Sequence, residues 1–138
     1  MTKTIGYEFK EHLIERQAKA EYAMLKEFEQ GDFTMESPLI KYNPYFVNDL
    51  AAVMLFRTEE ETAITVRVVG KTKEADIYHT FPKAKEHIIP IVGLYSNYEN
   101  KIEVYPYQKY NQKVVHTIET PEVAGAKLVE YMDTTPEY

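Results

Sequence analysis

The feature that most constrains the fold is the alternation of hydrophobic and polar residues that begins near residue 50. In the segment AITVRVVG, Ile64, Val66 and Val68 alternate with polar residues. Side chains two residues apart lie on the same face of a strand, so this pattern indicates a strand with one buried and one exposed face. Similar segments recur at spacings of roughly ten residues, separated by turn residues. The pattern predicts that most of the chain forms short antiparallel strands.

The composition of these segments also indicates how the strands are arranged. AAVMLFRT is apolar on both faces, as expected for a central strand that is covered from both sides. The prolines of SPLIKYNPYFVNDL are typical of an edge strand or an extended crossing segment. The segments together predict seven strands in a two-sheet antiparallel β-sandwich of the immunoglobulin or fibronectin type III class.

A proline and a glycine interrupt the most β-branched run, HIIPIVGLY. Pro90 has no backbone N–H to donate to a sheet, so we expect it on an edge strand or at a bulge. We expect Gly93 to turn the chain out of the sheet, with Leu94 or Tyr95 folding back over the end of the core. This segment is therefore interpreted as a structural corner.

An amphipathic helix is predicted before the strands. Between Tyr7 and Phe28, apolar residues recur at spacings of three or four, with charged residues between them. Gly31 stands where a left-handed residue usually follows a helix, so the helix is expected to stop near Gln30. The predicted fold class is thus mainly β: an Ig or fibronectin-III-like antiparallel β-sandwich preceded by an N-terminal amphipathic α-helix.

The expected organisation is a helix and lead-in at residues 1–36, a sandwich at 37–120 and a linker at 121–138. The chain has no Cys, which excludes a disulfide framework, a thiolate metal site and a cysteine nucleophile. Its net charge of -6 argues against nucleic acid as a partner. The sequence contains no run of ~18 consecutive apolar residues, so no membrane-spanning helix is predicted. For the chain as given, without a visible export signal, the expected location is cytoplasmic, with a periplasmic or cell-surface location as the alternative.

Histidines and acidic residues are the candidates for catalysis or metal binding in this sequence. His12, His79, His87 and His116 show no metal-ligand spacing, so structural or surface roles are favoured over catalytic ones. The acidic run 59–61 is interpreted as a charged, solvated turn, because adjacent carboxylates do not converge on one ion. The sequence therefore predicts no catalytic, metal-binding or cofactor-binding residue and no cofactor.

The chain contains twelve Tyr and no Trp, and five tyrosines follow one another within a short stretch. Such rings are amphipathic and are often found at contact surfaces, so packing within the molecule or against a partner subunit is favoured, with a sugar as the alternative partner. The residues of this tyrosine set, which form the candidate interface, are Tyr95, Tyr98, Tyr105, Tyr107 and Tyr110.

The order of several short motifs resembles a known family. NPY, a buried strand ending LFRT, then VRVVGK, DIYHTF and HIIPIVGLYSNYENKI together are similar to the N-terminal Ig-like domain of bacterial aryl-sulfate sulfotransferases. The chain departs from the family pattern at VNDLAAV, which lacks the usual Ser-Pro pair. The matching residues are Asn43, Pro44, Tyr45, Phe56, Thr58, Gly70, Lys71, Ile77, His79, Phe81, Ile89, Pro90, Gly93, Leu94, Tyr95 and Asn100.

This resemblance implies a non-catalytic module that contributes to a homodimer. In such enzymes a C-terminal six-bladed β-propeller carries the histidine that transfers a sulfuryl group from a phenolic sulfate ester to a phenol, without a nucleotide sulfate donor. Since the chain ends on TTPEY with no closing element, we expect it to continue into its own propeller, which would bind the phenolic sulfates. Two alternatives stay open: a stand-alone adhesion or carbohydrate-binding module that uses the tyrosine set, and an enzyme within this stretch itself.

Overall fold

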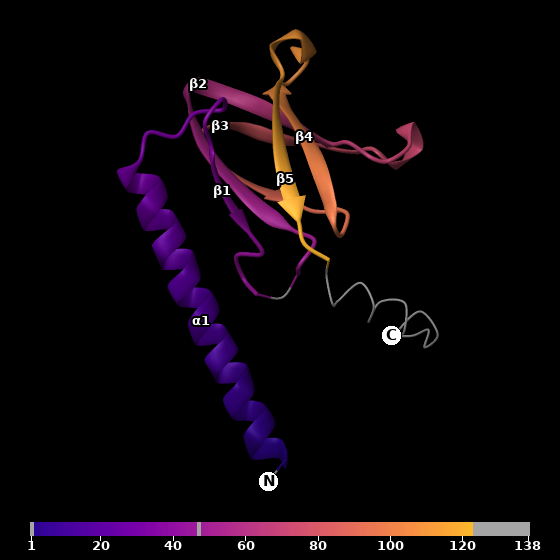
Figure 1. Ribbon diagram of the computed structural model, residues 1–138. Helices are drawn as coiled ribbons and strands as arrows, with labels where there is room; N and C mark the ends of the chain where they lie inside the picture. Colours follow the sequence, from indigo (N-terminus) through magenta and orange to yellow (C-terminus); the bar gives the residue numbers. More distant parts are fainter. Residues whose placement is uncertain (1, 47, 123–138) are drawn as a thin grey trace.

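A computed structural model describes residues 2–46 and 48–122, with side chains from residue 12 onward. The chain forms one long helix followed by five strands and two short 3-10 helices (Figure 1). The predicted linker at 121–138 lies outside the described residues, apart from its first two positions. The elements are α1 (Thr2–Gln30), β1 (Leu39–Tyr42), β2 (Ala52–Val68), η1 (Lys73–Ala75), β3 (Ile77–Ile91), β4 (Tyr98–Pro106), η2 (Tyr110–Gln112) and β5 (Val114–Thr120).

All five strands belong to one antiparallel sheet in which β2 is the central strand. The first half of β2 pairs with β1 and β3, and its second half pairs with β3 and β4. Strand β5 pairs with β4 at the far side. The predicted fold class, mainly β and antiparallel with one N-terminal helix, is confirmed.

The number of strands differs from the seven expected, because pairs of predicted strands are continuous. AAVMLFRT and AITVRVV form the single strand β2, and the acidic run 59–61 lies within it rather than in a separate turn. DIYHTF and EHIIPI likewise form β3. The register of β2 with β3 shifts between Arg57 and Thr62 and again between Thr62 and Ile64. Such irregularities bend a strand, so one long strand serves both layers of the fold.

The main core lies between these two layers. Alternate residues from both halves of β2 enter the same buried cluster, which requires the sheet to fold back on itself. The cluster consists of Ala52, Met54, Phe56, Ile64, Val66, Val68, Ile89, Ile91, Leu94, Ile102, Val104 and Ile118. The sandwich interior is therefore enclosed by a single, sharply bent sheet.

The first half of β2 is buried on both faces, as its composition predicted. Val53 and Leu55 point away from the main core and pack against Met24 and Phe28 of α1. Figure 1 shows that only the C-terminal part of α1 lies against the sheet and that the rest extends away from it. Among the described residues, no helix is long and apolar enough to cross a membrane.

The helix ends at Gln30, as predicted. The prediction that Gly31 has a left-handed backbone conformation is wrong. The positive-φ glycine is Gly93 instead. Gly31 is suited to its position for a different reason, because a Cβ there would lie 2.2 Å from the Phe33 ring. The last carbonyls of the helix are bound by Arg57, whose Nη1 donates to Gly31 O (2.9 Å) and whose Nη2 donates to Phe28 O (2.7 Å). Capping by a distant side chain replaces the local glycine cap.

The structure also confirms the interpretation of the Pro-Gly segment as a corner. β3 pairs with β2 alone, so Pro90 lies on an edge strand, opposite Val53. Gly93 has a φ of 82° and turns the chain out of the sheet. Leu94 is then buried at the end of the core, and its N–H donates to Leu50 O at 3.2 Å.

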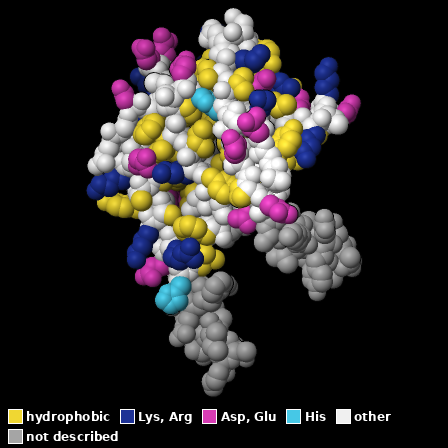
Figure 2. Space-filling view, viewed as in Figure 1, with side chains coloured by type: hydrophobic (Ala, Val, Ile, Leu, Met, Phe, Trp, Pro, Cys, Tyr) yellow, Lys and Arg dark blue, Asp and Glu magenta, His cyan; other side chains and the backbone are white. Residues whose placement is uncertain are grey.

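The surface is mixed in character. In the space-filling view, acidic and basic side chains are interspersed, with hydrophobic side chains between them (Figure 2).

Candidate functional site: an aromatic surface around Arg67

The structure divides the predicted tyrosine set into two groups at opposite ends of β4. The rings of Tyr95 and Tyr98 lie 5.2 Å apart, and those of Tyr105 and Tyr110 lie 5.1 Å apart. Seven residues of strand, roughly 23 Å, separate Tyr98 from Tyr105. Tyr107 follows β4 and is 51% exposed. The five tyrosines therefore do not form one continuous patch.

The tyrosine that contacts α1 is Tyr45, which is not one of the five. Its hydroxyl donates to Glu21 Oε1 at 3.1 Å, and its backbone oxygen accepts a hydrogen bond from Gln17 Nε2 at 2.8 Å. Burial and the Glu21 hydrogen bond raise the pKa of Tyr45. A tyrosine of the NPY motif, outside the predicted set, thus packs on the helix.

The group at the start of β4 has a structural role. Lys71 Nζ lies 4.6 Å and 4.7 Å from the ring centroids of Tyr95 and Tyr98. Beneath these rings the fully buried Asn100 accepts a hydrogen bond from Tyr95 N (2.8 Å) and donates to Ile118 O (3.2 Å). Buried polar groups of this kind hold a loop in one conformation. Asn100 therefore fixes the corner that follows Gly93.

The group at the end of β4 surrounds Arg67. The sheet register places Arg67 of β2 between Tyr78 of β3 and Glu103 of β4. Its Nη1 donates to Glu103 Oε1 (2.7 Å) and to the Tyr110 hydroxyl (3.4 Å), and its Nε donates to Asp76 Oδ2 (3.0 Å). The guanidinium of β2 thus bonds to β4, to η2 and to the residue between η1 and β3.

The Asp76 carboxylate that bonds to Arg67 also holds the loop between β2 and β3. Gly70 N donates to Asp76 Oδ1 at 2.7 Å, on the opposite side from Arg67. The Gly70 N–H, together with Arg67, holds the pKa of Asp76 below its usual value. Asp76 therefore stays charged and fixes both the loop and the guanidinium.

These side chains line a surface depression of about 520 Å3. Small-molecule sites span roughly 300–1,000 Å3, so the depression is large enough for a small ligand. Tyr105 is only 8% exposed, whereas Tyr78 and Tyr110 are 59% and 45% exposed. Burial raises the pKa of Tyr105 above its ordinary value. The lining residues are Arg67, Lys73, Asp76, Tyr78, Tyr105 and Tyr110.

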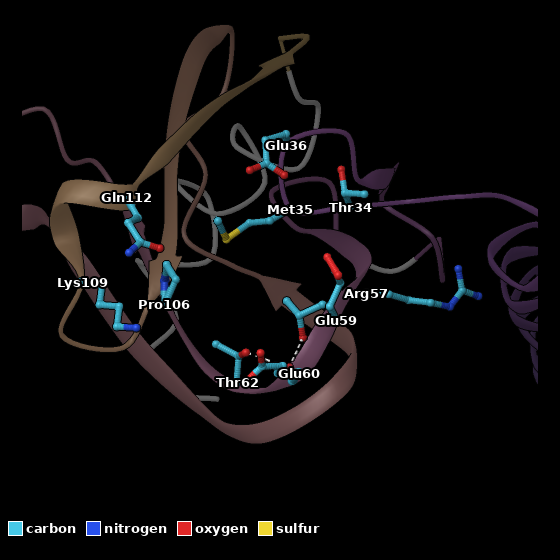
Figure 3. A pocket seen from close by; sticks show the side chains of 11 residues that line it. Thr34, Met35, Glu36, Arg57, Glu59, Glu60, Thr62, Pro106, Lys109 and Gln112 are labelled. Carbon is cyan, nitrogen blue, oxygen red and sulfur yellow. Dashed lines mark hydrogen bonds between the residues drawn. The ribbon is translucent and has the colours of Figure 1, made fainter.

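A second cleft, also of about 520 Å3, lies beside the bend of β2 (Figure 3). Glu36, Glu59 and Glu60 line it, and Arg57 points away from it toward α1. Among the described residues, no three His, Asp or Glu side chains are placed to hold a metal ion. The cleft therefore offers charged walls but no ion-binding cluster.

The four histidines are dispersed. His87 is buried and stacks on Phe56 at 5.0 Å, and burial lowers its pKa. His116 Nε2 lies 2.8 Å from Met35 O, and His79 packs against Phe81. Within residues 12–46 and 48–122, no hydrogen bond or ring contact joins two histidines.

Sequence reasoning missed Arg67 and Tyr78 as members of the site. Alternation along β2 placed Arg67 on the face away from the core, but that face is largely covered, since Glu103 and Tyr105 beside it are buried. Which residues cover it depends on register with β3 and β4. The available signal was the presence of Arg67 and Tyr78 on the polar faces of successive predicted strands.

The bent antiparallel sheet and its single enclosed core define an Ig-like β-domain. The chain matches the family model described as the arylsulfotransferase Ig-like domain over residues 39–123, which is more than half of its length. The chain belongs to this family, which confirms the resemblance seen in the sequence motifs. Comparison with curated proteins and with solved structures gives no match.

Proposed function

We propose that this chain is a non-catalytic assembly domain of an aryl-sulfate sulfotransferase. Membership of the arylsulfotransferase Ig-like family supports the proposal. In the proposed enzyme, a histidine of a separate C-terminal β-propeller takes the sulfuryl group from a phenolic sulfate ester, releases the phenol and passes the group to an acceptor phenol. The dispersed histidines of this domain agree with a role outside that chemistry.

The observation that carries the assembly role is an exposed apolar face on α1. Ile14, Tyr22 and Leu25 are 61%, 67% and 37% exposed. Their spacing places them on one side of the helix, next to the face that packs on β2. With Ala18 they line a shallow hollow of about 510 Å3 beside Tyr45. Solvated hydrophobic faces of this kind are characteristic of interaction surfaces.

The proposed partner is a second copy of the chain, whose α1 would pack against this face to form a homodimer. Glu21 and Lys26 flank the apolar residues, so two antiparallel copies can bring opposite charges together. We place the contact on α1 rather than on the tyrosine set because the two tyrosine groups lie at opposite ends of β4.

Light scattering coupled to size-exclusion chromatography tests this assignment. The chain should elute with twice its monomer mass of 16.1 kDa. Leu25→Glu should give monomers, because it places a charge in the proposed contact. The control Ala23→Glu, which introduces the same charge at an exposed position on the opposite side of the helix, should leave the dimer intact. A dimer that survives Leu25→Glu, or turnover of 4-nitrophenyl sulfate by this chain, would contradict the proposal.

A further inference from the structure

The depression around Arg67 contains polar groups that the fold leaves without a partner. The hydroxyl of Tyr105 makes no hydrogen bond among the described residues, although the residue is only 8% exposed. Arg67 donates from Nε and Nη1, but its Nη2 has no acceptor in the same part of the chain. Buried polar groups are normally satisfied, so the Tyr105 hydroxyl points to an external partner, whether water or a ligand. The Arg67 side chain is 19% exposed, so its Nη2 can donate to the same partner.

The rings around these groups are held in place before any ligand arrives. Tyr105 packs edge-on against Tyr110 with an interplanar angle of 87°. Lys113 Nζ lies 4.3 Å from the centroid of the Tyr110 ring, and Arg67 lies 5.9 Å from the centroid of Tyr78. A rigid aromatic wall binds with little loss of side-chain entropy. The depression is thus bounded on one side by the packed rings of Tyr105 and Tyr110, and the exposed ring of Tyr78 stands next to Arg67.

The charges of the depression are compensated. Arg67 pairs with two carboxylates, Asp76 and Glu103, and the charge of Lys73 acts on Asp76 as well. Two cations therefore face two anions. An anionic ligand would have to compete with carboxylates already bound to the guanidinium, so the balance favours an uncharged ligand.

We propose that the depression around Arg67 binds a neutral saccharide, with the apolar face of a sugar ring against the exposed ring of Tyr78 and sugar hydroxyls bonded to Tyr105 and Arg67 Nη2. A saccharide supplies both an apolar C–H face and several hydroxyl groups, which match the exposed ring and the two unpartnered donors. A phenol would stack on the same ring but has only one hydroxyl to satisfy them. The site does not depend on the assembly role and lies on a different surface from the α1 face.

Nuclear magnetic resonance titration of the isotope-labelled chain tests the proposal. The probes are maltotriose, cellotriose and mannotriose, with 4-nitrophenol and 4-nitrophenyl sulfate as the competing classes. At least one trisaccharide should shift the amide signals of Arg67, Tyr78 and Tyr105. Shifts there with the phenol or its sulfate alone, or with none of the probes, would overturn it.

Three variants separate binding from folding. Tyr105→Phe keeps the ring and removes only the hydroxyl, so saccharide affinity should fall by about two- to tenfold, the value of one hydrogen bond, with an unchanged spectrum elsewhere. Tyr78→Ala should reduce affinity about tenfold or more by removing the exposed ring. The control Tyr107→Ala, an exposed tyrosine that does not line the depression, should bind as well as the parent chain. Equal affinity for all four proteins would contradict the proposed site. This result does not depend on whether Leu25→Glu dissociates the dimer.

Discussion

Replacement of Arg57 by Met should detach α1 from the sheet while leaving the sandwich folded. Arg57 joins the two parts through two hydrogen bonds to the helix end and through its guanidinium, whose central carbon lies 4.0 Å from the centroid of the Phe28 ring. The buried contact of the helix is otherwise small, since Met24 and Phe28 are its members of the packed cluster. Methionine keeps an apolar stem of similar length but loses every donor.

The expected loss can be worked from these contacts. A hydrogen bond to a charged group contributes about 1.5–3 kcal/mol, but the Arg57 side chain is 30% exposed, so water replaces part of what is lost. The cation–π contact adds about 0.5–1 kcal/mol. The ion pair with Glu86, whose side chain is 65% exposed, adds little. We expect docking of the helix to weaken by about 2–4 kcal/mol, against a total stability of about 5–15 kcal/mol for ordinary domains.

Urea unfolding followed by two probes measures this effect. Far-ultraviolet circular dichroism at 222 nm reports α1, and tyrosine fluorescence reports mainly the sheet once Tyr7 and Tyr22 of α1 are replaced by Phe in every protein compared, because the chain has no Trp. In Arg57→Met the helical signal should be lost at lower urea than the fluorescence signal. Glu86→Gln, the matched control, removes only the exposed ion pair and should change stability by less than about 1 kcal/mol. Coincident transitions, with a loss below about 0.5 kcal/mol in Arg57→Met, would refute the proposed clamp.

Two further predictions concern the corner and the buried histidine. Gly93→Ala should lower stability by about 1–3 kcal/mol in thermal unfolding, because φ is 82° and the new Cβ would lie 2.4 Å from Ile77 Cδ1; an unchanged melting temperature would contradict this. Burial lowers the folded pKa of His87, so the unfolded chain binds more protons as the pH falls below about 6.5. Stability should therefore fall between about pH 7 and pH 5, and His87→Gln should reduce that dependence; identical pH profiles would rule out His87 as its source.

Local sequence was sufficient wherever a structural feature depends on near neighbours. The helix ends at Gln30, Pro90 lies on an edge strand, and Gly93 turns the chain out of the sheet, each as predicted. These features follow from backbone geometry within a few residues. The motif order around the corner was likewise enough to indicate the family.

Features that depend on pairing over long distances were not predictable in the same way. Nothing local indicates that Arg57 binds carbonyls of a helix almost thirty residues earlier, so a left-handed Gly31 was the reasonable but wrong expectation. The tyrosines were grouped by closeness in sequence, whereas β4 holds them at opposite ends.

The sequence alone therefore determined the type of each element, the antiparallel Ig-like class and the family, because alternation, proline and glycine act through the local backbone. Tertiary structure decided how many strands those segments form, which side chain closes the helix and which rings surround Arg67. The physical reason is that strand register and layer packing bring together residues far apart in the chain, and a shift of one residue would turn Arg67 into the core.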